Sequence, residues 1–207
     1  MPNLKLTYFN APGRAEPVRV ALFLAGLPFD DVRIDFAQFG ALRTQGSLPL
    51  ASVPVLEVDG VTMAQTGAML RYVARLGAPD LYPSDPMAAF IVDSAIDTFN
   101  DTLSHALMPS MFERDMERKL AMRATFVAGP MTLACRYAED LIARSGGPFL
   151  LGAALSIGDL MLASHVLQMQ SGRLDGITPD MLAPYPFLRG LAEAYLAHPR
   201  IKAYQAG

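Results

Sequence analysis

The sequence predicts a small α/β domain followed by an all-α domain. Strand and helix patterns alternate over residues 1–76, three prolines lie within residues 78–86, and only helix-like patterns follow. Alternating strands and helices are typical of an α/β sheet domain, whereas an uninterrupted run of helices indicates a separate domain. We therefore expect one domain at residues 1–78, a linker at 79–86 and a second domain at 87–207.

The first domain opens with a strand, a helix and a second strand. Apolar residues alternate with polar ones in "LKLTYF" at 4–9, which predicts a strand, and again in "DVRIDF" at 31–36. Between them the pattern at 13–28 predicts a helix, with Pro17 in its first turn, where a missing N–H is tolerated. The stretch from 37 to 54 shows no period, so we expect it to be irregular.

A hairpin and a helix complete this domain. Val55–Met63 reads as two short strands around Asp59-Gly60, a strong two-residue hairpin signal. Apolar residues at helical spacing then predict a helix over 66–77. The predicted order is β-α-β followed by β-β-α.

The second domain is expected to be helical throughout, with Gly and Pro at the breaks between helices. The predicted helices are 87–107, 116–146, 157–170 and 187–199. Pro109 should bend or end the helix in which it lies. In "LSIGDL", Ser156 can cap the N–H of Asp159 while Asp159 reaches back, and Leu155 can pack onto Leu160. This motif predicts a helix start rather than a catalytic site.

Composition excludes several classes of function. The chain has 207 residues, of which 52% are hydrophobic, yet no apolar run reaches membrane length and no signal peptide is expected. A net charge of −3 provides no basic surface for nucleic acid. The one cysteine, Cys135, allows no intrachain disulfide and no cysteine metal site, which suits the cytoplasm. The high apolar fraction favours an oligomer.

Pro54 lies directly before the predicted hairpin, and a proline at that place in a β-α-β, β-β-α order is the layout of a thioredoxin-like domain. In such a domain the proline is cis, and the residue before it turns its backbone toward a groove. Val53 would then offer one N–H and one C=O to an extended peptide, as a sheet edge does.

Five motifs in order along the chain carry a family resemblance: "LTYFNAPGRAEPVR", "SVPVLEVDG", "QTGAMLRYVAR", "SIGDL" and "HPRIKAY". Together they resemble a cytosolic glutathione transferase. The opening "MPNLKLTYFN" and the block "IVDSAIDTFND" are most similar to the sigma class, which includes the haematopoietic prostaglandin D synthases. The resemblance implies the glutathione transferase fold, a homodimer, glutathione as co-substrate and a role in detoxification.

Tyr8 and Arg14 are the residues that the resemblance assigns to catalysis. A cysteine thiol has a pKa of about 8.5, so a hydrogen-bond donor aimed at the sulfur is needed to keep it anionic near neutral pH. Tyr8 ends the first strand and is placed to donate that bond, and lowering the thiol pKa by two would be worth about 2.7 kcal/mol. Arg14 matches an arginine that supports the tyrosine electrostatically. Alone, each residue also fits an ordinary sheet-edge or helix-surface position.

Three further residues are expected to hold the γ-glutamyl end of glutathione. Gln65 and Thr66 come at a helix start, which attracts a carboxylate; Thr66 stands where the family usually has Ser, and it could also serve as the helix N-cap. Asp101 matches an aspartate that reaches the glutathione amino group from the partner subunit, although a solvated acidic face is the alternative. Asn100 replaces a carboxylate of the metal cluster in related prostaglandin synthases, so no metal is predicted.

The glycine end of glutathione is where the chain departs from the family. Phe39 stands at the position of a tryptophan and Ser52 at that of a lysine, and the loop between them is two residues longer. Arg43 matches a lysine position and could pair with the glycyl carboxylate. The affinity for glutathione and the identity of the thiol substrate are therefore open. A glutathione modified at its glycine end would contact these replaced residues.

The electrophile pocket is expected between Tyr8 and the second domain. The candidates by position are Phe9, Met108, Met111, Phe112 and Tyr204. Met adapts to varied apolar ligands, but the same residues could simply be core.

The sequence thus predicts a glutathione transferase that adds the thiolate to apolar electrophiles. Two alternatives stay open. One is a glutathione-dependent isomerase of the prostaglandin type, although residues 104–112 lack the pocket tryptophan of those enzymes. The other is a non-catalytic binding or structural protein, against which the joint presence of the site residues argues.

Overall fold

The computed structural model describes residues 1–206, with the backbone alone at Leu103 and Ser104. The chain divides into two compact units, Met1–Pro79 and a second that begins at Asp80. The first unit contains the sheet. Among its described residues the second contains helices and two isolated β-bridges, Phe149 with Gly152 and Leu151 with Ala154. The predicted fold class, an α/β thioredoxin-like domain followed by an all-α domain, is confirmed.

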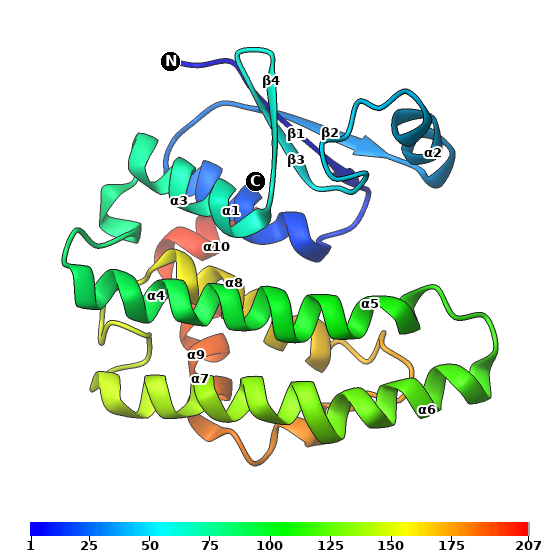
Figure 1. Cartoon of the computed structure of the whole chain (residues 1–207). Helices are drawn as coiled ribbons and strands as arrows, with labels where there is room; N and C mark the ends of the chain where they lie inside the picture. Colours follow the sequence, from blue (N-terminus) through cyan, green and yellow to red (C-terminus); the bar gives the residue numbers. More distant parts are fainter. Residues whose placement is uncertain (207) are drawn as a thin grey trace. The chain divides into compact units, whose positions relative to one another are not determined.

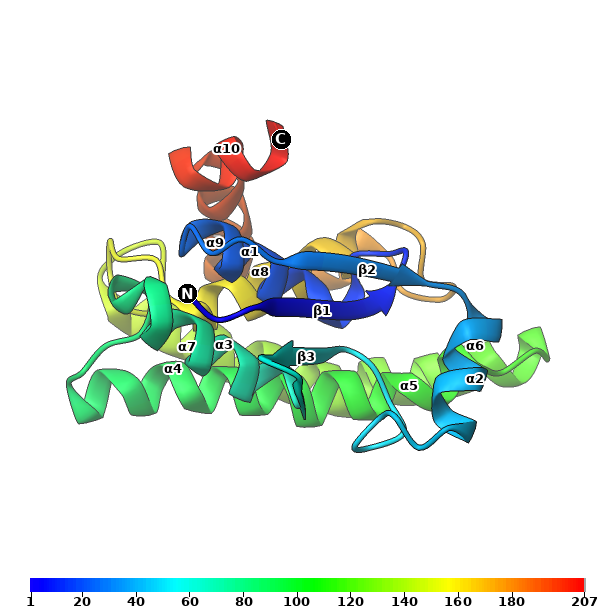
Figure 2. The same cartoon turned by 90° about the horizontal axis from the view of Figure 1, so that it is seen from above.

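The first unit is built on a four-stranded sheet in the order β2-β1-β3-β4. β1 (Leu4–Phe9) pairs in parallel with β2 (Asp30–Ile34) and antiparallel with β3 (Val55–Val58), which pairs with β4 (Val61–Ala64). Figure 2 shows β2, β1 and β3 side by side. The parallel β1–β2 pair and the antiparallel hairpin reproduce the predicted β-α-β, β-β-α order.

The predicted tight hairpin is confirmed at the turn between β3 and β4. Asp59 has φ 49° and Gly60 has φ 86°, and positive φ at both central residues is what a two-residue hairpin turn requires. The turn is also tied to the start of the chain, because the Asn3 N–H donates to Asp59 Oδ1 at 2.8 Å and the Asp59 N–H donates to the Asn3 carbonyl at 3.0 Å.

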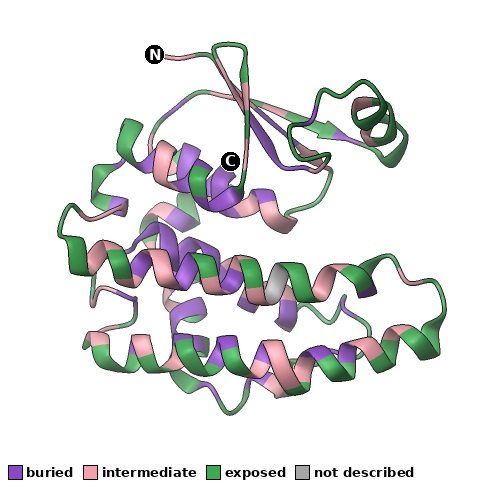
Figure 3. Ribbon diagram, viewed as in Figure 1, coloured by how far each residue is buried: buried purple, intermediate pink, exposed green. Residues whose placement is uncertain are grey.

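Two helices enclose the core of this unit. The 3₁₀ turn η1 (Gly13–Ala15) leads into α1 (Glu16–Leu24), and α3 (Thr66–Gly77) packs against α1. Leucines of β1, α1, β3 and α3 are buried there, and Figure 3 shows the buried positions along α1 and β1. The core therefore fixes the end of β1 and the starts of α1 and α3.

One prediction for the first unit is wrong. The stretch expected to be irregular contains the helix α2 (Phe36–Thr44), which starts with a capping box. The Gln38 N–H donates to Asp35 Oδ1 at 2.7 Å, and the Asp35 N–H donates to Gln38 Oε1 at 2.9 Å. Local capping holds this helix. It buries none of its residues, so it has no apolar stripe that a periodicity search could detect.

The second unit consists of long helices interrupted by π-helical turns. Its helices are α4 (Pro86–Thr98), α5 (Ala106–Met111), α6 (Met116–Phe126), α7 (Thr132–Ser145), α8 (Ile157–Gln170), α9 (Pro186–Ala197) and α10 (Pro199–Ala206). In Figure 1, α4 runs on into α5 and α6 runs on into α7. The π turns Phe99–His105 and Val127–Met131 join these pairs.

Two prolines accompany those turns. Pro130 lies in the second π turn, and Pro109 lies in α5, four residues after the last residue of the first. Proline lacks the N–H that would bond the carbonyl four residues earlier, so the ladder must adjust nearby. α5 ends at Met111, which agrees with the predicted disruption of this helix at Pro109.

The α8 helix is the centre of the second unit. It packs against α4 and α9 and is buried over most of its length. The predicted capping box at its start is confirmed: the Asp159 N–H donates to Ser156 Oγ at 3.4 Å, and the Ser156 N–H donates to Asp159 Oδ2 at 2.7 Å. The Ser156 hydroxyl also donates to Oδ2, at 2.6 Å. The Leu150 N–H donates to Oδ1 of the same side chain at 2.9 Å, so this carboxyl also holds the preceding loop.

We predict that Asp159→Asn lowers the free energy of unfolding by about 2 kcal/mol near neutral pH, because an amide nitrogen would face donors in the core. Burial raises the pKa of Asp159 from 3.8 to about 6. Since the folded pKa is above the unfolded one, the stabilisation due to the protonated form is full below about pH 4 and is lost as the pH rises through about 6. Urea unfolding of both proteins across this range checks the prediction; a difference independent of pH contradicts it.

Among residues 1–206, no helix is both long enough and apolar enough to cross a membrane.

Candidate active site

Tyr8 lies at the end of β1, directly before the turn that leads into α1. The backbone N–H of Arg14 donates to the Tyr8 hydroxyl oxygen at 3.3 Å. Because this bond occupies a lone pair of the oxygen, the hydroxyl proton must point elsewhere and can be donated to a ligand. The main chain therefore orients the Tyr8 hydroxyl and leaves its proton to be donated; its donation to a thiol stays a prediction.

Gly13 is what lets the turn approach the tyrosine so closely. Its φ is +45°, and a Cβ atom at this position would lie 2.6 Å from the Tyr8 hydroxyl oxygen. Sequence reasoning missed this residue, although a glycine directly before the predicted catalytic arginine was a signal that could have found it.

Arg14 connects three segments of the first unit. Besides its N–H bond to Tyr8, its guanidinium Nη2 donates to the Val53 carbonyl at 2.6 Å, and its own carbonyl accepts from the Thr66 hydroxyl at 3.3 Å. The Nε atom of Arg14 is buried and has no partner among the described residues. Through its backbone and its side chain together, Arg14 therefore joins the end of β1, the loop before β3 and the start of α3.

The Val53–Pro54 peptide bond is cis, as predicted. The Val53 carbonyl accepts from the Arg14 guanidinium, which occupies one of its two lone pairs. The expectation that Val53 offers both backbone groups to an extended peptide stays a prediction.

Gln65 and Thr66 stand at the N-terminus of α3. Gln65 is the N-cap residue with φ 77°, and no side chain caps the helix. The alternative in which Thr66 is the cap is therefore wrong: its side chain is 4% exposed and donates to Arg14 instead. The N–H groups of the first turn are left for another acceptor, and a helix N-terminus favours an anion.

Arg43 and Phe39 lie together on α2. The guanidinium carbon of Arg43 is 5.5 Å from the centroid of the Phe39 ring, and Phe39 packs against Phe9 with ring centroids 5.3 Å apart. Arg43 is exposed, whereas Ser52 is half-buried in the loop before β3. Arg43 is thus the cation of this segment that could meet a carboxylate.

The remaining predicted residues belong to the second unit. Asp101 is exposed in the π turn that follows α4, with Oδ1 3.7 Å from Nδ1 of His105. Met108 and Met111 lie on α5, with Phe112 just after its end, and Tyr204 lies on α10. Met108 and Tyr204 are half-buried, while Met111 and Phe112 are exposed.

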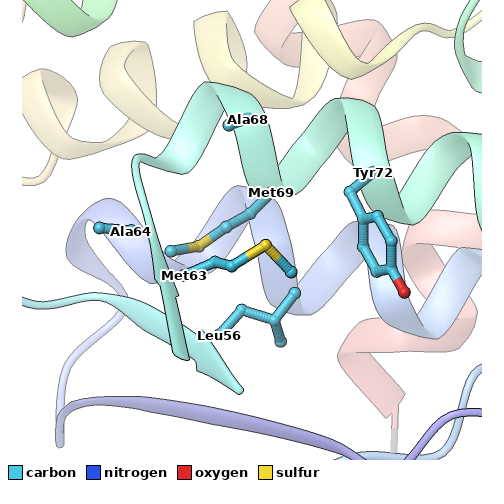
Figure 4. A pocket seen from close by; sticks show the side chains of 6 residues that line it. All are labelled: Leu56, Met63, Ala64, Ala68, Met69 and Tyr72. Carbon is cyan, nitrogen blue, oxygen red and sulfur yellow. The ribbon is translucent and has the colours of Figure 1, made fainter. Parts of the chain in front are cut away.

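A small apolar pocket lies elsewhere in the first unit. It is formed between the β3–β4 hairpin and α3, and Figure 4 shows its lining residues, Leu56, Met63, Ala64, Ala68, Met69 and Tyr72. None of these is a predicted site residue, so this pocket is distinct from the predicted electrophile pocket.

The one cysteine of the chain, Cys135, is poorly suited to act as a nucleophile. Cys135 is fully buried in α7, and burial, together with the charge of Glu139, raises the pKa of its thiol to about 12. A thiol that stays protonated and covered is a poor nucleophile. Within the described part of the chain, no cluster of three or more His, Cys, Asp or Glu residues is arranged to hold a metal ion.

Two family models match the chain. The glutathione S-transferase N-terminal domain matches residues 4–75, and the glutathione S-transferase C-terminal domain matches residues 100–207. The chain belongs to the glutathione S-transferase family. It is therefore a transferase that uses glutathione as its co-substrate, and the predicted kind of enzyme is confirmed.

Other glutathione S-transferases and related enzymes match over the whole chain. Glutathione S-transferase 1 of Ascaris suum is 30% identical over 211 residues, covering 100% of this chain and 97% of that protein. The structure of prostaglandin synthase D of Nilaparvata lugens has a TM-score of 0.83 at 30% identity, covering 99% and 98% of the two chains. A monomeric glutathione S-transferase of Necator americanus has a TM-score of 0.76 at 26% identity, covering 99% and 96%.

Proposed function

We propose that this glutathione S-transferase conjugates glutathione to small apolar electrophiles, with the Tyr8 hydroxyl stabilising the glutathione thiolate. The observation that carries the proposal is the bond from the Arg14 N–H to the Tyr8 oxygen. It leaves the phenolic proton for a sulfur and adds the partial positive charge of an amide to the same oxygen. A hydrogen bond to the charged form lowers the pKa of the thiol and raises the share of nucleophile.

Glutathione would lie along the first domain, residues 1–78. The Val53 N–H next to Pro54 would bind its cysteinyl backbone, and the start of α3 with Gln65 and Thr66 would bind the γ-glutamyl carboxylate. Asp101 of a partner subunit would meet the amino group. Arg43, flanked by Phe39 and Ser52, would hold the glycyl carboxylate. Arg43, Phe39 and Ser52 would therefore determine which thiol the enzyme accepts, glutathione or a form modified at its glycine end.

The helical domain, residues 87–207, would contribute side chains that bind the second substrate, the electrophile. Its candidate residues for binding the electrophile are Met108, Met111, Phe112 and Tyr204, and the candidate of the first domain is Phe9; methionines adapt to varied apolar ligands. We place the enzyme in the sigma class, as a cytoplasmic homodimer with a role in detoxification. The dimer is supported by the apolar composition, and sedimentation of the purified protein tests it.

The direct test is the conjugation of glutathione to chlorodinitrobenzene by the purified protein. Conjugation above the uncatalysed rate supports the proposal, whereas tight glutathione binding without turnover would favour a binding protein. A second candidate, isomerisation of prostaglandin H2, is favoured by the similarity to the prostaglandin synthase of Nilaparvata lugens. Formation of prostaglandin D2 in the presence of glutathione tests it.

Thr66→Val is expected to raise the KM for glutathione about tenfold while changing kcat little. Valine keeps the shape but removes the hydroxyl, which would turn from the Arg14 carbonyl to donate to the γ-glutamyl carboxylate. Loss of one such contact with the ligand costs about 1.4 kcal/mol. The matched control is Thr62→Val on β4, which should leave both constants unchanged. Equal KM values for the Thr66 variant and wild type would remove this residue from the proposed site.

A further inference from the structure

Arg19 of α1 is the largest of the fully buried side chains, at 1% exposure. Its guanidinium Nε lies 3.1 Å from both carboxylate oxygens of Asp31, and Nη1 lies 3.3 Å from Glu16 Oε2. An arginine without exposure is unusual and needs such partners, because an unpaired buried charge is costly. Its Nη2 atom nevertheless has no partner among the described residues.

The same guanidinium also binds the main chain of the turn that follows Tyr8. Nη1 donates to the carbonyl of Ala11 at 2.9 Å and to that of Pro12 at 3.2 Å. These two carbonyls directly precede Gly13 and Arg14, which pack against and hydrogen-bond the tyrosine. Arg19 therefore fixes the segment that brings the Arg14 N–H to the Tyr8 oxygen.

Arg19 meets the tyrosine directly as well. Its guanidinium carbon lies 5.9 Å from the centroid of the Tyr8 ring, within the range of a cation–π contact. One buried side chain thus holds both partners of the Arg14–Tyr8 hydrogen bond: the ring on one side and the turn on the other. None of the sequence patterns singled out this residue.

We propose that Arg19 is a positioning residue for thiolate formation, acting through the Tyr8 ring and the Ala11–Pro12 carbonyls; this rests on the proposed function of Tyr8. Its planar fork of donors is what the role requires. Lysine would keep the positive charge, but a single ammonium on a flexible stem cannot reproduce the same set of donor directions toward Asp31 and two carbonyls.

The experiment compares Arg19→Lys and Arg19→Met with wild type in the chlorodinitrobenzene assay across pH. Both variants are expected to lower kcat about tenfold at neutral pH, to leave the KM for the electrophile within twofold, and to shift the pH profile of kcat/KM to higher pH. Arg33→Gln is the local control. Arg33 shares Asp31 with Arg19 but is 42% exposed, and in the turn after Tyr8 it reaches only the Asn10 side chain, at 3.5 Å, and neither of the two carbonyls. Its replacement should therefore change none of these values.

The experiment must distinguish a general loss of protein stability from a displacement of the Tyr8 ring and the turn after it. Asp159→Asn is expected to destabilise the other unit and so provides a control for stability: it should leave the pH profile unchanged at a temperature where it is folded. If Arg19→Met does not fold, Arg19→Lys and Asp31→Asn, which releases the guanidinium, answer the same question.

Two outcomes overturn the inference in distinguishable ways. An unchanged pH profile and kcat in the folded Arg19 variants, beside a strong loss in Tyr8→Phe, would remove Arg19 from the mechanism and leave the proposed function intact. Wild-type activity in Tyr8→Phe would remove the proposed role of Tyr8 itself, and the role of Arg19 with it.

Discussion

Tyr8→Phe is expected to lower kcat/KM for chlorodinitrobenzene near neutral pH by about 100-fold. The variant keeps the ring, and so its contacts with Gly13 and Arg19, but loses the hydroxyl that would donate to the thiol. Raising the thiol pKa by two corresponds to about 2.7 kcal/mol of lost thiolate stabilisation. Steady-state kinetics of the two proteins at a series of pH values measures the effect.

The loss should shrink as the pH rises, because free hydroxide ionises the thiol without help from the enzyme. Tyr72→Phe is the matched control: this tyrosine is half-buried on α3, lines the apolar pocket of Figure 4, and should be replaced without loss of activity. A Tyr8 variant as active as the Tyr72 variant at neutral pH would contradict the proposed mechanism.

Gly13→Ala is expected to be the second most damaging substitution. A Cβ atom would lie 2.6 Å from the Tyr8 hydroxyl oxygen and 2.8 Å from its Cε1 atom, so the ring or the turn has to move. A shift of the turn also moves the Arg14 N–H away from the oxygen. We expect kcat/KM to fall by more than tenfold and the free energy of unfolding by about 1–3 kcal/mol.

The positive φ of Gly13 adds strain that must be separated from the clash. Gly26→Ala provides this control, because Gly26 has φ +63° but an added Cβ would meet no atom within 4 Å. It should lower the free energy of unfolding by about 1 kcal/mol and leave kcat/KM unchanged. Equal activity losses in the two alanine variants would show that the clash with Tyr8 has no functional consequence.

Much of the fold could be predicted from local patterns. β1 and α3 begin and end where the alternation and the helical period predict, since each has one face in the core. α2 was missed because none of its residues is fully buried, with Phe39 and Leu42 only half-buried against the core, and because its start depends on the Asp35–Gln38 capping box. The π turns could not be predicted at all, because nothing in a 3.6-residue period distinguishes them from an ordinary helix.

Some residues of the candidate site could likewise be proposed from the sequence, whereas the contacts between them are visible only in the folded structure. Pro54 was singled out by its place before the hairpin, and Tyr8 and Thr66 were proposed because a family resemblance marks them. The contacts of Arg14 with Val53 and Thr66 join residues 39 and 52 positions apart in the sequence, and no single-sequence pattern reports such pairs. Arg19 was hidden for another reason: it lies in an apolar helix, where an arginine would be read as solvent-exposed.

The central claim is that the Tyr8 hydroxyl keeps the bound glutathione sulfur anionic. Its most direct test is the ultraviolet titration of the thiolate in the complex of the protein with glutathione, for wild type and Tyr8→Phe. The account predicts an apparent thiol pKa in the wild-type complex about two pH units below that of a free thiol, and a value near the free one in the variant. The same low pKa in both complexes would contradict it.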